Sequence, residues 1–578
     1  MLRRPAFDEN RFTERQTDMD DQIVKFARLP LTIVVLCAAL IAGAAVGEDQ
    51  TASESENVVA PQQLVDIFSL RADVRKLLKA QSSFTAISGD GEVNDEFLFG
   101  ILDVIERQKL LVADSPAFFR CDLSATWPEE GLAVTAVAPI GRDRIHEWFD
   151  EDPEKFEEAS DGITMIDGTP VLIADDYTAL LQCDTPIAED RLVRLNRVLK
   201  ETRELRHQKM ASLSSQPRQI GRSALKPFIA SFRAGLAADA QRRDNESDFD
   251  FSWRSLYQRS VLALVDVFFN DIERLEYSLD WSEADESLVF EVKIEAAKKS
   301  SLDQYVDRVR SGDSRALSWL HPDHEMFATA TVPIPAFIQE LLPEVGKATA
   351  VAVQQEWRLS DGTREQIGRF FSDIGERGRL DALIQTIPVS DGSRAIAGVL
   401  PLDVGGSLSP AVVELVSATG GFDSSVPTTD IGGWPLHRMK DFDAFQTTGA
   451  SGDCDLFLVV TENAIAWIIG TEKSIPVLET IVLREFQADA EGDRFRRCAF
   501  AAKSSAASLL RFSEFADNTK ERVPKHVADQ APRDNIRITL DTEPHTLLLT
   551  AHFERDATLL GLQAFNFVTL SLLELLDL

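Results

Sequence analysis

The chain has 578 residues, 44% of them hydrophobic and 34 of them Phe, so it can bury a large core. At this length we expect about two to four domains. Its formal net charge is −34 at pH 7. A surface this acidic repels phosphate backbones, which argues against nucleic acid as a partner.

The first predicted element is an apolar run over residues 29–46, LPLTIVVLCAALIAGAAV, with basic residues shortly before it. A basic flank, an apolar centre and small residues at the far end are typical of an export signal. The run is also near the minimum length of a membrane span, so an uncleaved anchor is the alternative. Cys37 lacks the small preceding residue of a lipid attachment site, and Met19 would give a more normal leader than Met1. We predict that residues 1–47 direct the chain to the periplasm, cell envelope or exterior.

Five later segments are predicted to be β-hairpins, because alternating apolar and polar residues flank a polar turn in each. Three follow one plan of strand, polar turn and strand, and cover residues 121–140, 275–296 and 536–553. Two shorter hairpins, at 171–183 and 456–470, are each followed by a helical pattern. This recurrence predicts a fold assembled from similar units.

Helical patterns separate these hairpins and lead to the predicted fold class. Long ones cover residues 223–243, 251–272 and 363–387, and strand-then-helix segments cover 326–342, 395–416 and 498–512. The last segment, 558–578, is very apolar and is predicted to be a buried closing helix, with a dimer seam as the alternative. The class is therefore α+β, with repeated antiparallel hairpin and sheet units covered by helices in two or three lobes.

Composition shifts suggest where the lobes meet. We expect an N-terminal α+β lobe at 48–214, a middle lobe at 215–420 and a C-terminal lobe at 436–578. Residues 421–435 form a loop rich in Gly, Pro, Ser and Thr. This loop is interpreted as a linker into the last lobe, and because long loops often carry function, a lid over a cleft is the alternative.

Four cysteines remain beyond the leader: Cys121, Cys183, Cys454 and Cys498. An even number in an exported chain permits disulfides. The spacing favours Cys121 with Cys183 and Cys454 with Cys498. Four buried thiols are the alternative.

Histidine patterns point to no metal site. His146-Glu147 and His324-Glu325 each begin an H-E-x-x-H zinc motif, but the second His is missing from both. His321 and His324 are separated by a Pro, which disfavours a helical ligand pair. We therefore predict a loop leading into the strand at 326.

Other short motifs are incomplete as well. Residues 244–250, DNESDFD, lack the Gly and the bidentate Glu of a calcium loop, so an acidic turn between helices is predicted. The S-x-x-K pattern at 223–226 stands alone and is interpreted as a helix start. Gly346-Lys347 lacks the first Gly of a P-loop, and there is no G-x-S-x-G. We assign no catalytic, cofactor-binding or metal-ligating residue.

One predicted helix, residues 191–209, is basic in this acidic chain. Its seven Lys and Arg recur every third residue and therefore wind around the helix instead of forming one face. Docking against the acidic segment 147–161 is the predicted role. An anionic surface, such as phospholipid heads or a cell-wall polymer, is the alternative.

The recurring strand, turn, strand and helix plan looks like that of large uncharacterised exported bacterial proteins, over most of the mature chain. The resemblance implies no activity and no functional residue. Our leading hypothesis is an exported, non-catalytic binding or scaffolding protein with an envelope protein or polymer as partner, and with membrane contact only through residues 29–46 if uncleaved. The alternatives are a secreted glycosidase-like hydrolase that uses two carboxylates, and a carrier of an apolar ligand.

Overall fold

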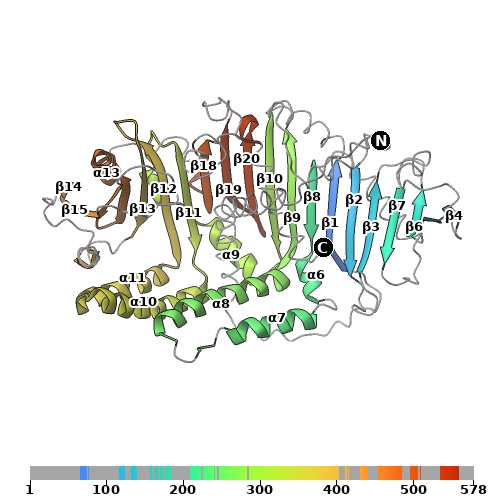
Figure 1. The fold of residues 1–578 in the computed structure, drawn as a ribbon, viewed down its shortest axis with the longest axis horizontal. Helices are drawn as coiled ribbons and strands as arrows, with labels where there is room; N and C mark the ends of the chain where they lie inside the picture. Colours follow the sequence, from blue (N-terminus) through green and yellow to red (C-terminus); the bar gives the residue numbers. More distant parts are fainter. Residues whose placement is uncertain are drawn as a thin grey trace, which may run out of the picture.

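A computed structural model provides the structure of the chain (Figure 1). It describes residues 65–73, 76, 116–123, 132–138, 156–158, 163–166, 169–173, 178–183, 209–222, 226–239, 241–243, 246–282, 285–402, 410–412, 414, 430–439, 454–483, 495–505, 508 and 534–558. The predicted signal at 29–46, the apolar segment after 558 and most of the loop at 421–435 lie outside these residues.

The described residues form strands, α-helices and short 3-10 turns. The strands are β1 Val65–Asp73, β2 Pro116–Leu123, β3 Leu132–Ala138, β4 Phe156–Glu158, β5 Ile163–Ile166, β6 Thr169–Ile173, β7 Thr178–Cys183, β8 Ala211–Ser215, β9 Ile272–Ser282, β10 Ser287–Ala296, β11 Met326–Pro333, β12 Arg379–Pro388, β13 Arg394–Pro401, β14 Asp430–Ile431, β15 Trp434–Met439, β16 Asp455–Val460, β17 Ala464–Gly470, β18 Phe500–Ser505, β19 Asn535–Glu543 and β20 Thr546–Glu554. The helices are α6 Pro217–Arg222, α7 Lys226–Asp239, α8 Asp248–Asn270, α9 Ser301–Arg310, α10 Ala336–Trp357, α11 Asp361–Arg377 and α13 Ile475–Leu483, with 3-10 turns η5 Ala316–Trp319, η6 Glu472–Ser474 and η7 Arg555–Ala557.

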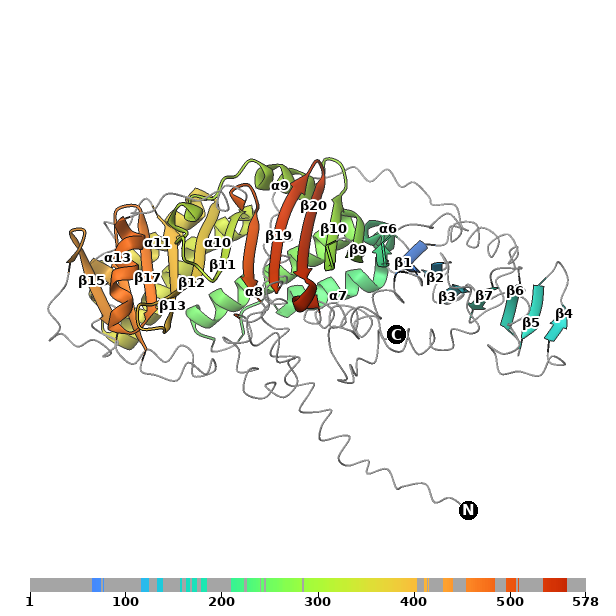
Figure 2. The ribbon, with the colours of Figure 1, turned by 90° about the horizontal axis from the view of Figure 1, so that it is seen from above.

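The strands build one long antiparallel sheet (Figure 2). Its order is β4-β5-β6-β7-β3-β2-β1-β8-β9-β10-β20-β19-β18-β11-β12-β13-β17-β16-β15-β14. Helices and a large antiparallel sheet occur in one chain, so the predicted α+β class is confirmed. The five predicted hairpins are found as antiparallel neighbours.

The two halves of this order follow the same connectivity. Counted outwards from the centre, β10-β9-β8-β1-β2-β3-β7-β6-β5-β4 matches β20-β19-β18-β11-β12-β13-β17-β16-β15-β14. At the centre β10 pairs with β20, and Glu291 lies opposite Thr550. The residues just before these two strands, Glu286 and His545, both have left-handed backbones, with φ of 48° and 63°. His545 lies 259 residues after Glu286 in the chain, and Thr550 lies the same number of residues after Glu291. Glu291 therefore lies opposite its own equivalent, Thr550, at the centre of the pairing.

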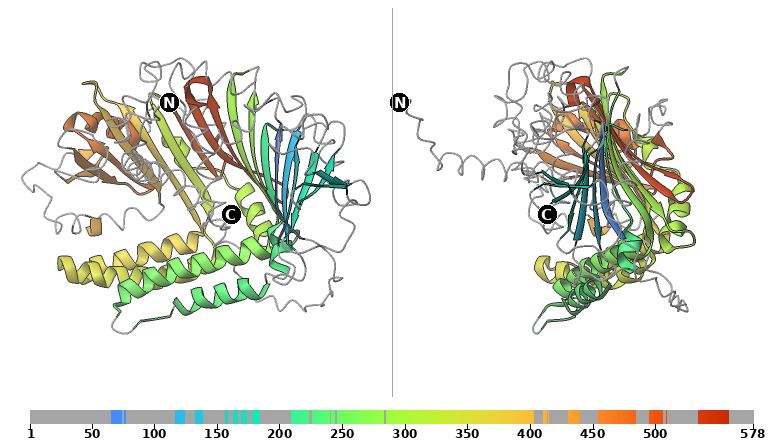
Figure 3. Two further views of the ribbon diagram at one scale, coloured as in Figure 1. Left: turned by 45° about the vertical axis from the view of Figure 1, so that its right-hand side comes forward. Right: turned by 90° about the vertical axis from the view of Figure 1, so that its right-hand side faces the viewer.

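Four helices lie together along one end of the strands, and we call α7, α8, α10 and α11 the helical layer (Figures 1 and 3). Helix α10 packs against both α11 and α8, and α8 packs against α7. Two other helices lie elsewhere: α9 contacts β19, β11 and β20, and α13 contacts β17. The helical layer therefore has contacts of its own, distinct from those of the helices on the sheet.

Two large clusters of buried apolar residues lie within the described part of the sheet. One is formed by β9, β10, β19 and β20 with α9, where Tyr305 is fully buried. The other is formed by β12, β13, β16 and β17 with α13, where Phe457 is 1% exposed. Buried and half-buried residues alternate over most of β16 and β17, which supply apolar side chains to the second cluster.

The structure corrects one predicted helix. Residues 363–387 were expected to be helical throughout, but α11 ends at Arg377 and β12 begins at Arg379. The helix ends at Gly378, which caps it with φ of 61°. Glycine adopts this left-handed backbone without the penalty of a side chain, so it is the usual residue at this position.

Candidate binding surface on the helical layer

Exposed large apolar side chains gather on the helical layer. Within the described part of the chain they are Phe232 on α7, Phe249, Trp253 and Tyr257 on α8, Val351 on α10, and two others elsewhere, Ile384 and Leu483. Tyr257 is 66% exposed and Trp253 is 41% exposed. Single exposed apolar residues are normal, but a group on neighbouring helices marks a candidate interaction surface.

Three of these residues form what we call the aromatic stripe: Phe249, Trp253 and Tyr257. They are spaced by four residues on α8, which places them on one face of the helix. The Phe249 and Trp253 rings pack edge to face with centroids 6.5 Å apart. Ser255, Ala263 and Val267 of the same helix are buried, so the stripe is not the core-facing side.

Trp253 is held in place by two neighbouring helices. Its Nε1 donates a hydrogen bond to Thr349 Oγ1 of α10 at 3.1 Å. Its ring packs edge to face on Phe371 of α11, with centroids 6.4 Å apart. Gly346 lets the two helices approach, because a Cβ there would lie 2.4 Å from Phe371 Cβ. The Gly346-Lys347 pair therefore serves helix packing.

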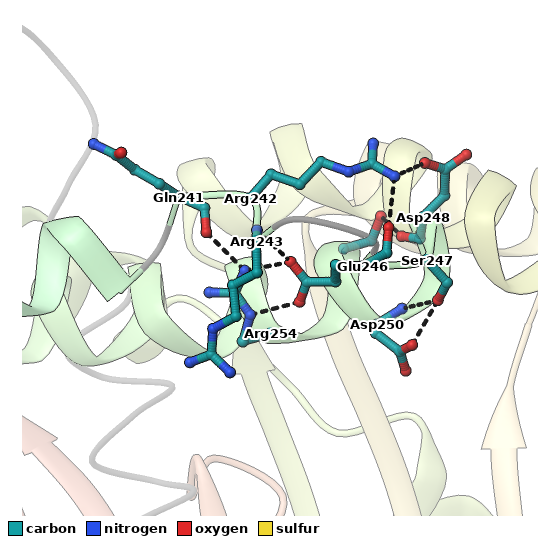
Figure 4. A network of polar contacts seen from close by, with 9 residues as sticks. Gln241, Arg242, Arg243, Glu246, Ser247, Asp248, Asp250 and Arg254 are labelled. Carbon is teal, nitrogen blue, oxygen red and sulfur yellow. Dashed lines mark hydrogen bonds and ion pairs between the residues drawn. The ribbon is translucent and has the colours of Figure 1, made fainter.

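The turn between α7 and α8 is braced by one ion pair (Figure 4). The Arg254 guanidinium donates to both Glu246 oxygens, at 2.7 Å from Nε and 2.6 Å from an Nη. The backbone N–H of Arg243 donates to the same carboxylate at 3.0 Å, and Arg254 also donates to the carbonyl of Gln241. Both charged side chains are at most 15% exposed. Arg254 follows Trp253 directly, so the brace fixes the helix that carries the stripe.

The start of α8 is fixed by further polar contacts. Ser247 Oγ accepts a hydrogen bond from the Asp250 N–H at 3.0 Å, which is an ordinary N-cap. Arg242 donates to Asp248 at 2.7 Å and to the Glu246 carbonyl. The guanidinium carbons of Arg242 and Arg254 also lie 5.5 and 5.9 Å from the centroid of the Phe251 ring, within cation–π range.

These contacts explain the acidic segment at 244–250. The hydrogen bond from Arg254 lowers the pKa of Glu246 to about 2, although partial desolvation opposes it. Glu246, Asp248 and Asp250 each have a partner within the turn. No group of three or more potential metal ligands occurs among the described residues. The segment joins α7 to α8, in agreement with the predicted acidic turn between helices.

Helix α7 is the most exposed member of the layer. Arg233 binds Asp266 of α8, with 2.6 Å between Nε and Oδ1. Burial raises the pKa of Asp266, and Arg233 opposes that rise. Most of the remaining α7 side chains that the structure describes, Phe232 among them, face solvent. Helix α7 therefore presents an exposed surface of its own beside the C-terminal half of α8.

The histidine pair lies where the sequence predicted, in a loop before β11. His324 Nδ1 lies 2.7 Å from the carbonyl oxygen of His321, and the His321 N–H donates to Gln385. Glu325 forms an ion pair with Arg394, with 3.0 Å between Oε1 and Nη2. The loop is thus tied to β12 and β13 by ordinary structural contacts.

The four cysteines lie on or beside strands. Cys121 is on β2 and Cys183 on β7, opposite Val134 and Ala133 of the intervening β3. Strands separated by a third are about 9.5 Å apart, while a disulfide requires Cα atoms within about 7 Å. This register does not support a bridge between Cys121 and Cys183. Cys498 is buried and donates a hydrogen bond to Asp541 at 3.0 Å. The bridge from Cys454 to Cys498 stays a prediction.

Several carboxylates that a hydrolase could use have structural partners. Asp381 accepts hydrogen bonds from Ser314, Thr331 and the backbone before η5. Glu414 accepts from Ser360 and Thr363 at the start of α11, which lowers its pKa. These contacts cap helices and join elements.

The aromatic stripe is the feature that the sequence interpretation missed. The predicted helix at 251–272 was correct in place, but its exposed side depends on α10 and α11. The basic run at 191–209 lies outside the described residues except for Lys209, which forms an ion pair with Glu291 of β10. Its predicted partner segment, 147–161, is described only at 156–158.

Within the described part of the chain, no helix combines the length and apolar character needed to cross a membrane. Comparisons with family models, with curated proteins and with solved structures find no match to this chain.

Proposed function

We propose that this chain is an exported binding or scaffolding protein that holds its partner on the helical layer. The observation that carries the proposal is the aromatic stripe, exposed on a helix that is itself firmly braced. Aromatic residues dominate the energetics of binding surfaces because they bring a large apolar area with few rotatable bonds. A surface fixed before binding also loses less entropy when the partner arrives. The long sheet provides the rigid support.

A binding test follows directly from the exposed positions. Tyr257→Ser and the double change Trp253→Ala/Tyr257→Ser are compared with Ile384→Ser. Ile384 is the matched control because it is 49% exposed but lies on β12, outside the helical layer. Crosslinking in envelope fractions should recover a partner with the unchanged chain and with Ile384→Ser, and much less with the stripe variants. Equal recovery with all four proteins would contradict the proposal.

Export rests on the apolar run at 29–46 and has its own test. Sequencing the N-terminus of the mature protein should find a new end near residue 47 if the run is a cleaved signal. Retention of the run in a membrane fraction would identify it as an anchor. Recovery of the complete chain from the cytoplasm would contradict export.

We also propose that the sheet consists of two copies of a ten-strand unit, residues 65–296 and 326–554. The matched strand order and the shared left-handed residues before β10 and β20 support this division. The central register tests it. Cysteines at Lys293 and Leu548, which lie opposite each other, should form a disulfide, while cysteines at Lys293 and Phe553 should not. A disulfide between cysteines at 293 and 553, with none between 293 and 548, would contradict the central pairing and with it the division into two units.

A further inference from the structure

We infer that the helical layer docks on the surface of a phospholipid bilayer through the aromatic stripe. This inference rests on the proposed function and names the partner of that same surface. It is carried by two observations: the chemistry of the exposed side chains and the place where the chain begins its first described strand.

The side chains suit the boundary between lipid and water. Trp and Tyr combine an apolar ring with a polar group and are enriched where membranes meet water. Trp253 and Tyr257 supply these rings, and Phe249 adds purely apolar area beside them. Exposed charges of both signs lie at the start of α8 beside the group, including Arg242 and Asp248. Such a rim suits zwitterionic headgroups.

The net charge decides between kinds of lipid surface. At −34, the chain is repelled by a strongly anionic bilayer. Attachment through aromatic rings needs no electrostatic attraction, because burial of apolar area drives it. We therefore assign a zwitterionic phospholipid surface as the occupant, and expect binding that changes little with salt.

The path of the chain brings this surface to the membrane. Strand β8 runs antiparallel to β1 and ends at Ser215, just before α6. Helix α6 contacts β1, α7 and α8, so β1 begins at the end of the sheet where the helical layer lies. Residues 29–46 act here in their alternative role, as an uncleaved anchor that stays in the bilayer, and a mature end near residue 47 would overturn the inference.

The connecting segment is long enough for contact. Residues 47–64 can span at most about 60 Å, while α8, with 23 residues, is about 35 Å long. The stripe near the start of α8 can therefore rest on the bilayer that holds residues 29–46.

Photo-crosslinking to lipid tests the inference. The full chain is incubated with phosphatidylcholine vesicles that contain a photoactivatable phosphatidylcholine, and labelled peptides are mapped by mass spectrometry. We expect labels on residues 29–46 and on α8 around Tyr257. Tyr257→Ser should lower α8 labelling about threefold, and Trp253→Ala/Tyr257→Ser about tenfold, with labelling of 29–46 unchanged. Ile384→Ser should leave both labels unchanged.

The alternatives give different results. Labels on 29–46 with none on α8 would overturn the membrane inference. If the stripe variants still lost a crosslinked envelope protein, the proposed function would stand without it. A chain whose light-scattering mass is that of a dimer, and falls to a monomer in Tyr257→Ser, would identify a second copy as occupant and also overturn the inference. Tyr257→Ser keeps the test valid if the double variant fails to fold, because Tyr257 is mostly exposed.

Discussion

The sheet and the helical layer use aromatic side chains in opposite ways. In the sheet and the helix α9 that packs on it, Phe457 and Tyr305 are at most 1% exposed and lie within apolar clusters. In the helical layer, Trp253 and Tyr257 are 41% and 66% exposed, and polar contacts hold the backbone that carries them. Burial stabilises the first region, while hydrogen bonds and ion pairs position the second. The difference separates a part of the molecule that keeps the fold from one free to bind.

The largest expected effect is in the sheet. Phe457→Ala removes a fully buried ring from the cluster under α13 and should lower the free energy of unfolding by about 3–5 kcal/mol. Ile384→Ala, on the exposed side of β12, is the control and should cost less than about 1 kcal/mol. Denaturant unfolding followed by tryptophan fluorescence measures both. Similar losses of unfolding free energy for the two variants would contradict the contrast between buried and exposed positions.

The second prediction concerns acid and the brace of the helical layer. The pKa of Glu246 is lowered to about 2 from an ordinary 4.5, so the charged form favours the folded state. Its contribution is complete above pH 4.5 and is lost as the pH falls from there towards 2. In hydrogen exchange at neutral pH, Glu246→Gln should speed exchange around the start of α8 about tenfold.

The pH profile supplies the sharper form of this test. The unchanged protein should lose protection at the α7–α8 turn between pH 4.5 and 2, while Glu246→Gln should show no such step of its own. Glu365→Gln on α11 is the control, because its contact with Arg369 is exposed and 3.6 Å long. An identical pH profile for the unchanged chain and Glu246→Gln would show that the brace does not hold the turn.

The two regions also differ in how far the sequence predicts them. The hairpins were predictable because alternation along a strand is a local pattern, and β9–β10 and β19–β20 lie where that pattern occurs. The pairing of one hairpin with the other was not predictable, because Glu291 faces a residue 259 positions away and no local period specifies such a partner. The prediction of one helix over 363–387 was wrong beyond Gly378, because this glycine caps α11 and ends it.

The binding surface was missed for a related reason. The four-residue spacing of Phe249, Trp253 and Tyr257 predicts a common helix face, but the same spacing is typical of a core-facing stripe. Only the positions of α10 and α11 decide which face of α8 is covered. The start of α8 was predictable from the acidic segment, because Ser247 and Asp250 have the spacing of an N-cap.

The third prediction returns to the sheet through the helix that packs on it. Ser300 caps α9, accepting a hydrogen bond from the Asp303 N–H at 3.1 Å. Ser300→Ala should destabilise the protein by about 1 kcal/mol, the usual cost of losing an N-cap. Ser311→Ala, at the exposed end of the same helix, is the control. Equal unfolding midpoints for Ser300→Ala and the unchanged protein would mean that packing on β19 and β20 alone fixes α9.

The smallest expected effect on stability is also the most informative for function. Tyr257→Ser should change the free energy of unfolding by no more than about 0.5 kcal/mol, because the side chain is mostly in solvent. Thermal unfolding against the unchanged protein measures this. A loss of several kcal/mol would mean that Tyr257 supports the fold, and the stripe would then need no partner to explain it. A near-zero loss together with weakened binding would assign the residue to recognition, since exposed aromatic area that does not stabilise the fold has its effect only when something covers it.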